Sequence, residues 1–279
     1  MEVPQGGNAT RGATVTVSNV SVRSVDAVPA PLLRAGKFLF DWIPLVILTV
    51  LWEYASGTAV PAEILPPPTR VVGEIQELIV SGEVYSHLFT SLFRIGVGLG
   101  LSIAVGVLLG IGMARLDPVE DFFEVLLALT YPIPKTALVP LAILWLGVGT
   151  ETAVLIVFLA CLLPIVLNAY NAAENVDKNL VWAAKMMGTD GRQLFRKVVI
   201  PATIPEILTG VRQAIPIAFI ALVSAELIAS DKGIGYLILT AGQVGNYPTM
   251  FANIVIISAV AFFAVRGYEI LRERVLVWT

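Results

Sequence analysis

The chain contains few residue combinations that could carry out chemistry on a substrate. It has one histidine, His87, and one cysteine, Cys161, among 279 residues. We therefore expect neither a metal cluster nor a catalytic triad, with Cys161 packed in an apolar run and His87 packing or capping a helix end. A phosphate-binding loop needs the pattern G-x-x-x-x-G-K-[ST]. The nearest segment, Gly188–Arg192 (GTDGR), lacks both the spacing and the lysine.

Four ionisable residues lie inside otherwise apolar segments: Arg94, Lys135, Arg212 and Glu226. Because charge is costly in hydrocarbon, such residues are candidates for the lining of a solute path, where a cation would attract an anion. Arg212 and Glu226 are 14 residues apart, roughly 21 Å along a helix, so they cannot pair directly. The alternative is that each cation binds a backbone carbonyl or Glu226, or extends to the membrane interface.

A polar segment, Asn179–Pro201, separates two apolar runs and must form a loop at one membrane face. Helical spacing predicts a short helix that Gly188 ends by adopting a positive φ. A second short helix, about 190–199, should follow and be broken at Pro201. Exposed apolar residues with a basic rim suit insertion into a groove of a partner protein. The residues predicted to serve this contact are Leu180, Trp182, Ala183, Ala184, Met187, Gly188, Leu194, Phe195 and Pro201.

The elements that hold these residues are predicted to be transmembrane helices. The composition is 57% hydrophobic and 14% charged, whereas soluble domains carry about 25% charged residues. An apolar run of about 20 residues spans a bilayer. We therefore predict an all-α polytopic membrane protein with about six transmembrane helices, of which the third is interrupted by prolines. The six runs are 39–57, 87–114, 121–147, 151–174, 204–229 and 249–271.

Two further patterns refine this architecture. Gly98, Ser102, Gly106 and Gly110 follow each other in steps of four, which predicts a ridge of small residues where another helix packs closely. That packing could lie within the chain or between subunits. Apolar residues at helical spacing between 71 and 79 predict an amphipathic helix on the outer surface.

The positive charges orient the predicted spans, since Lys and Arg collect in cytoplasmic loops. With both termini inside, 13 of the 18 Lys and Arg fall in cytoplasmic segments and two, Arg70 and Lys232, fall outside. We therefore expect a mobile cytoplasmic tail at 1–36 and a transmembrane domain at 37–279 with a cytoplasmic loop at 175–203. The cytoplasmic cations are Arg11, Arg23, Arg34, Lys37, Arg115, Lys178, Lys185, Arg192, Arg196, Lys197, Arg266, Arg272 and Arg274.

The loop resembles that of the permease subunits of ATP-binding-cassette (ABC) importers. The family pattern is E-A-A, three residues, Gly, nine residues, then I-x-L-P. The chain departs from this pattern at Trp182, where the acid would stand. Outside the loop, residues 87–97, 131–149 and 201–239 look like the branch of the family that imports nitrate, sulfonates and taurine. The matching residues are Ala183, Ala184, Gly188, Val198, Ile200 and Pro201.

This resemblance, which covers about residues 40–272, implies the type I ABC importer permease fold. It also implies that Leu180–Gly191 is a coupling helix docked on a separate ATPase subunit, which would bind ATP and Mg. The other expected partners are a second permease copy forming a homodimer, an extracytoplasmic solute-binding protein at the outer loops 58–86 and 230–248, and membrane lipid. No nucleic acid partner is expected, and the expected location is the bacterial inner membrane.

The sequence leaves the solute open. A small anion such as nitrate, a sulfonate or taurine is the prediction that follows from the resemblance, and a neutral heterocyclic vitamin precursor is the alternative. An ion-driven carrier or channel would need no ATPase and would leave the apolar stripe of the loop unexplained. A membrane-embedded enzyme would need a cluster of His, Asp or Glu at one interface.

Overall fold

The structure, a computed structural model, describes residues 30–276, and their regular elements are all helical. The chain divides into two units between Val50 and Leu51. The described part of the first unit is the beginning of α1 (Ala30–Ala55). This helix includes residues 30–36 of the predicted tail, and the remainder of that tail lies outside the described residues.

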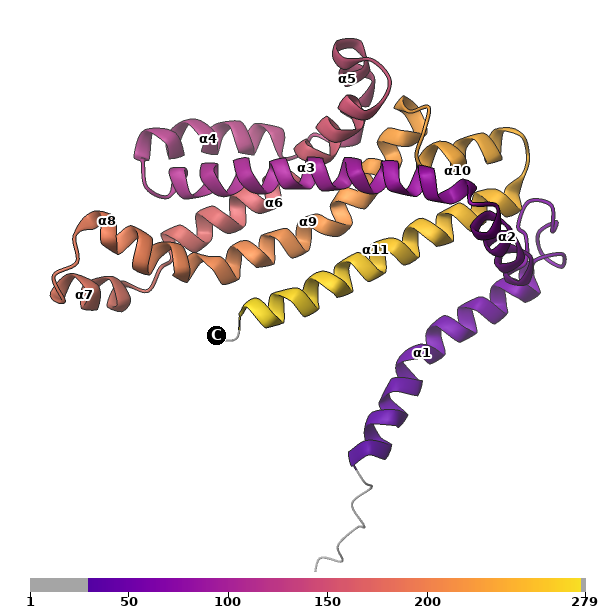
Figure 1. The fold of residues 1–279 in the computed structure, drawn as a ribbon, viewed down its shortest axis with the longest axis horizontal. Helices are drawn as coiled ribbons and strands as arrows, with labels where there is room; N and C mark the ends of the chain where they lie inside the picture. Colours follow the sequence, from indigo (N-terminus) through magenta and orange to yellow (C-terminus); the bar gives the residue numbers. More distant parts are fainter. Residues whose placement is uncertain (1–29, 277–279) are drawn as a thin grey trace, which may run out of the picture. The chain divides into compact units, whose positions relative to one another are not determined.

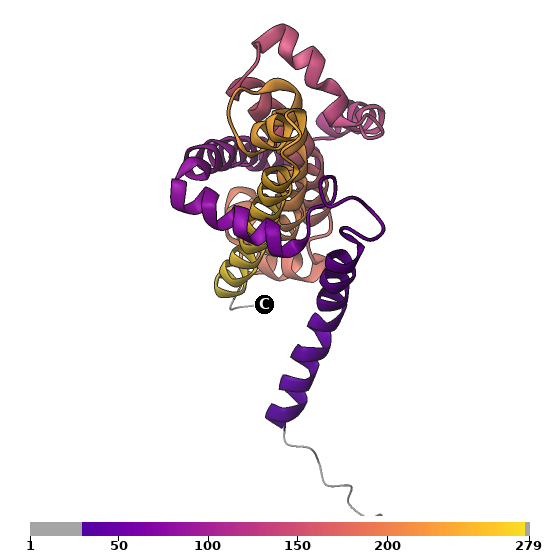
Figure 2. The ribbon, with the colours of Figure 1, turned by 90° about the vertical axis from the view of Figure 1, so that its right-hand side faces the viewer.

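The second unit is a bundle of helices joined by short turns (Figure 1). The long helices α3, α6, α9 and α11 run alongside one another in both views (Figure 2). The helices are α2 (Pro68–Ser81), α3 (Glu83–Met113), α4 (Asp117–Thr130), α5 (Val139–Leu146), α6 (Thr150–Glu174), α7 (Lys178–Met186), α8 (Gly191–Leu194), α9 (Ile200–Ala229), α10 (Ile234–Gln243) and α11 (Tyr247–Val275).

Four helical segments of the described chain are long and apolar enough to cross a membrane: α3, α6, α11 and the continuous stretch Gly191–Ala229. The helices α3, α6 and α11 correspond to the second, fourth and sixth predicted spans, and Gly191–Ala229 contains the fifth. The third predicted span is a pair of helices, Asp117–Thr130 and Lys135–Leu146, bent by 89°. The bend lies at Pro132 and Pro134, since each proline removes a backbone donor. Of the first predicted span, the apolar stretch 42–55 of α1 is described with its side chains.

The small-residue ridge on α3 is confirmed, and within this chain it packs against α6. A Cβ on Gly98 would lie 2.7 Å from Val157, and one on Gly110 would lie 2.5 Å from the carbonyl oxygen of Val166. Ser102 donates a hydrogen bond to the carbonyl of Phe158 at 2.9 Å. Backbones can approach this closely only where side chains are absent or small, so the ridge fixes the contact between α3 and α6.

The expectation that Pro201 breaks the helix is wrong. The short π-helical turn Phe195–Val199 connects α8 to α9, and the amide of Ile200 donates to the carbonyl of Phe195, five residues back. Pro201 then occupies the first turn of α9. The proline lies just after the π-helical turn, and its fixed φ suits a helix. The helix therefore continues from Gly191 to Ala229 without interruption.

Candidate functional site

The first candidate site is the helical hairpin α7–α8, formed by the polar segment. The Asp177 carboxylate accepts the Asn179 amide at 2.8 Å and caps the start of α7. Gly188 ends this helix with φ +82°, as predicted. The Asp190 carboxylate accepts the Gln193 amide at 2.6 Å and caps α8. Local capping thus specifies both helices and the turn between them.

The outer surface of α7 is strongly apolar. Trp182 is 64% exposed, Met186 92% and Met187 78%, and Leu180 and Ala183 are also exposed. Sequence reasoning missed Met186, although its position four residues after Trp182 places it on the same helix face. Exposed aromatic and methionine side chains are typical of the cores of protein interfaces. This surface therefore has the composition of a docking site.

Other predicted residues of the hairpin lie inside it or beneath it. Ala184 is buried, and its carbonyl accepts both the amide and the hydroxyl of Thr189, at 3.2 and 2.6 Å. Leu194 and Phe195 are half-buried, and the Arg115 guanidinium lies 5.9 Å from the Phe195 ring centre. These residues can hold the shape of the hairpin, whereas the exposed side chains of α7 can contact a partner. The basic rim is exposed and consists of Lys178, Lys185, Arg192, Arg196 and Lys197.

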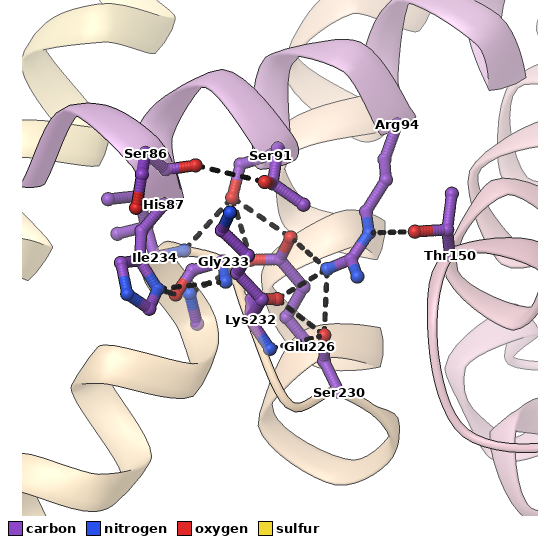
Figure 3. Close-up of polar contacts among 12 residues, drawn as sticks. Ser86, His87, Ser91, Arg94, Thr150, Glu226, Ser230, Lys232, Gly233 and Ile234 are labelled. Carbon is purple, nitrogen blue, oxygen red and sulfur yellow. Dashed lines mark hydrogen bonds and ion pairs between the residues drawn. The ribbon is translucent and has the colours of Figure 1, made fainter.

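The second candidate site is a buried polar cluster around Arg94 and Glu226 (Figure 3). Arg94 on α3 and Glu226 on α9 are 2% and 0% exposed, and Arg94 Nη1 lies 2.9 Å from Glu226 Oε1. Ser91 donates to both carboxylate oxygens at 2.9 Å, and Arg94 Nε donates to Thr150 Oγ1 at 3.3 Å. A buried charge pair with such partners meets the conditions under which ionised groups persist in an interior.

The cluster also satisfies the backbone of the turn between α9 and α10. The amides of Gly233, Ile234 and Gly235 donate in turn to His87 Nδ1 at 3.1 Å, Ser91 Oγ at 2.9 Å and Glu226 Oε2 at 2.9 Å. Arg94 Nη1 donates to the carbonyl of Lys232 at 2.6 Å. The Glu226 carboxylate thereby lies at the N-terminus of α10, where unpaired amides and the helix dipole favour negative charge.

Glycine is required where this turn passes the carboxylate. Gly233 has φ +125°, and a Cβ there would lie 2.3 Å from the Glu226 carboxylate. A Cβ on Gly235 would lie 2.6 Å from Cβ of Glu226. The backbone can therefore reach the carboxylate oxygens only because both positions lack a side chain.

The other two candidate path residues lie apart from this cluster. Arg212 donates through Nε and Nη2 to Glu269 Oε1 at 3.0 and 2.7 Å, and it is half exposed. Lys135 Nζ donates to the carbonyls of Thr130 and, at 3.1 Å, Ile133, so it binds the last carbonyl of α4 and one in the turn that follows. The structure thus pairs Arg94 with Glu226 and separates them from Arg212 and Lys135.

The two candidate sites lie at opposite ends of α9 (Figure 1). The hairpin precedes this helix, and Glu226 lies near its end, beside α10. Ile200 and Glu226 are 26 residues apart, or about 39 Å along a helix. The arrangement can therefore bind a partner at one face of a membrane and hold a rigid turn toward the other face.

Comparison with known proteins identifies relatives of this architecture. Residues 102–277 match the family described as binding-protein-dependent transport system inner membrane component. The putative aliphatic sulfonates transport permease protein SsuC of Bacillus subtilis is 32% identical, over 88% of this chain and 91% of the relative. The taurine transport system permease protein TauC of Escherichia coli is 30% identical, over 84% and 86%.

Two other similarities bear on the solute and on the fold. The formylaminopyrimidine transport permease protein ThiX of Halalkalibacterium halodurans is 30% identical, over 88% of this chain and 98% of the relative. A chain of the MetNI methionine ABC transporter in an inward-facing conformation superposes with a TM-score of 0.57 at 16% identity. It covers 67% of this chain and 93% of that one. The second similarity concerns the fold alone.

Proposed function

The chain belongs to the family of binding-protein-dependent transport system inner membrane components, and we propose that it forms the path for a small anionic solute in an ATP-driven importer. The anion class rests on similarity to the sulfonate and taurine permeases. The observation that carries the coupling role is the apolar surface of α7, with Trp182, Met186 and Met187 exposed. A separate ATPase subunit, which would hold ATP and Mg, is the proposed occupant of this surface.

The proposed assembly contains two copies of this chain, two ATPase subunits and an extracytoplasmic solute-binding protein. The charge asymmetry of the loops supports cytoplasmic termini and a cytoplasmic hairpin. The solute-binding protein would then dock at the opposite face, where α2 and the turn between α9 and α10 lie. Alternating access would follow when ATP binding shifts the equilibrium between inward- and outward-facing conformations.

The roles of the four charged residues in a solute path remain predictions. The contacts of Arg94 and Glu226 favour a structural role, because their polar atoms bind each other and the backbone. Arg212 and Lys135 are more accessible than this pair, and either could meet a passing anion.

The coupling proposal can be tested with Met186→Glu, which places a charge at the most exposed apolar position of α7. We expect this variant, expressed with its ATPase subunit, to lose co-purification of that subunit and uptake of radiolabelled taurine or alkanesulfonate. Leu116→Glu is the matched control, since Leu116 is 56% exposed in the turn between α3 and α4, outside the hairpin. Equal loss in both variants, or loss in neither, would contradict a specific docking surface on α7.

A neutral heterocycle is the second candidate solute, favoured by the similarity to the formylaminopyrimidine permease. The same cells can be offered labelled taurine and labelled formylaminopyrimidine in parallel. Uptake of the pyrimidine alone would replace the anion proposal and leave the coupling proposal intact.

A further inference from the structure

Charged side chains converge where α9 and α11 approach each other, far from α10. Glu269 accepts from Arg212 through Oε1 at 2.7 Å and from Arg266 through Oε2 at 2.9 Å. One carboxylate is therefore shared by two guanidinium groups. Glu269 can neutralise only one of these two positive charges.

A third arginine, Arg272, has unused hydrogen-bonding capacity. Its Nη2 donates to Thr209 Oγ1 at 2.8 Å, but its buried Nε has no hydrogen-bond partner. None of the salt bridges found within residues 42–276 involves Arg272. A buried donor without an acceptor is costly, so an acceptor that reaches Nε would be favoured.

These groups surround a cavity of about 540 Å³ lined by Arg212, Glu269, Arg272, Glu273 and Leu276. The lining itself holds two arginines and two glutamates, and Arg266, which is bound to Glu269 outside the lining, adds one further positive charge. The cavity has ample room for a tetrahedral oxyanion with its first waters, since one water occupies about 30 Å³ of liquid. Guanidinium groups suit this ligand because their paired donors match two oxygens of a phosphate.

The depth of the cavity in the membrane favours a lipid phosphate as the source of the oxyanion. Arg212 precedes Ala229, the last residue of α9, by 17 residues, and Arg272 follows Tyr247, the first residue of α11, by 25. These separations are about 26 and 38 Å at 1.5 Å per residue. The hydrocarbon core is about 30 Å thick. Measured from a membrane boundary at these helix ends, Arg212 lies close to the opposite edge of the core and Arg272 lies beyond it, in the headgroup layer on the side away from α10.

We propose that this cavity is an oxyanion site that binds the phosphate group of an anionic phospholipid between α9 and α11. The guanidinium of Arg272 and the accessible side of Arg212 would donate to the phosphate oxygens, while Glu269 keeps Arg212 and Arg266 in place. Ile270 and Leu271, which are 55% and 60% exposed, lie beside the site on α11 and offer apolar surface to acyl chains. The site requires neither the ATPase nor the transported solute.

The test measures lipid retained by the purified full-length chain in native mass spectrometry after incubation with phosphatidylglycerol or phosphatidylcholine. Arg272→Gln should lower retention of phosphatidylglycerol about fivefold, the effect of one basic residue near a membrane surface. Arg274→Gln is the matched control, because Arg274 is exposed on the same helix and does not line the cavity. Retention of phosphatidylcholine should change in neither variant.

A second pair of variants guards against misfolding of Arg272→Gln. Leu276→Glu adds a carboxylate to the cavity lining, and Val275→Glu adds the same charge next to it but outside the lining. We expect Leu276→Glu to lower the retention of phosphatidylglycerol more than Val275→Glu does, because both add one negative charge but only the former adds it to the cavity lining. Equal retention within both pairs would overturn the proposal.

A separate arm distinguishes lipid from soluble anions. Inorganic phosphate at millimolar concentration is added to lipid-free protein, and its effect on the thermal unfolding midpoint is compared between Arg272→Gln and Arg274→Gln. Stabilisation that depends on Arg272 would assign a soluble oxyanion to the same site, whereas retention of phosphatidylglycerol without a phosphate effect assigns the lipid headgroup. If neither phosphatidylglycerol retention nor stabilisation by phosphate depends on Arg272, the oxyanion site is refuted.

Discussion

Replacing Arg94 with methionine should strand the Glu226 carboxylate in the protein interior. The carboxylate would keep the hydrogen bonds from Ser91 and Gly235 but lose the guanidinium 2.9 Å away, and the carbonyl of Lys232 would keep only the Ser230 hydroxyl of its two side-chain donors. Removing one member of a buried ion pair costs about 3–5 kcal/mol. We therefore expect the free energy of unfolding to fall by about 4 kcal/mol.

The double variant Arg94→Met with Glu226→Gln separates this effect from lost packing. Glutamine removes the stranded charge, and its carbonyl oxygen can still accept the amide of Gly235. We expect the double variant to recover about 2 kcal/mol relative to Arg94→Met, since the stranded charge accounts for about half of the cost and the lost packing and hydrogen bonds for the rest. Each kcal/mol shifts the thermal midpoint of a domain of this size by about 2–4 °C. The expected losses are thus about 10 °C for the single variant and about half of that for the double.

The assay is thermal unfolding of each variant in nanodiscs of one lipid composition, with uptake measured in parallel. Arg70→Met is the control, because Arg70 is exposed on α2 and a surface substitution changes stability by about 0.5 kcal/mol or less. A double variant no more stable than Arg94→Met would refute the stranded-charge argument. Unchanged stability with lost uptake in Arg94→Met would instead support Arg94 as a residue of the solute path.

Three further substitutions and one activity measurement test other parts of the structure. Gly110→Ala should lower the thermal midpoint, because its Cβ would lie 2.5 Å from a backbone oxygen, whereas Gly100→Ala meets open space and should not. Gly233→Ala should destabilise by more than Gly245→Ala; both glycines have positive φ, which costs about 1–2 kcal/mol, but only the former meets a carboxylate. Lys135→Gln should reduce uptake with assembly intact if Lys135 lines the path, and unchanged uptake would leave it as a cap of α4. The purified chain alone should hydrolyse no ATP in a phosphate-release assay, and robust turnover without a second subunit would contradict a separate ATPase.

Local sequence patterns predicted the helical hairpin and the ridge well, because both depend on neighbours in the chain. The turn at Gly188 and the four-residue spacing from Gly98 to Gly110 are short-range signals with a direct physical reading. Pro201 was misread as a helix break because a proline also suits the first turn of a helix. The π-helical turn that places it there leaves no recognised sequence signature.

The polar cluster could not be predicted, because its members are far apart in the sequence. Helical geometry correctly excluded a direct pair between Arg212 and Glu226. A bond to Glu226 was one of the alternatives for the cations in the spans, but the sequence did not single out Arg94, 132 residues away, as the partner. The two glycines of the turn, Gly233 and Gly235, permit tight backbone geometry, but their presence in the sequence does not indicate that a carboxylate requires it. Such pairings follow from how α3 and α9 pack, which is a property of the whole bundle.

The buried charges are best understood through the backbone that they serve. Irregular backbone at membrane depth is tolerated only where its polar groups are satisfied within the protein. The turn from Ser230 to Gly235 presents three amides and one carbonyl that the helices on either side cannot satisfy, and each is bound by a side chain of α3 or α9. The cluster therefore stabilises the turn and the start of α10 as a unit. Because α8 and Glu226 belong to opposite ends of one continuous helical stretch, Gly191–Ala229, the hairpin is joined to this turn through α8 and α9, with only the short turn at Gly188 between α7 and that stretch.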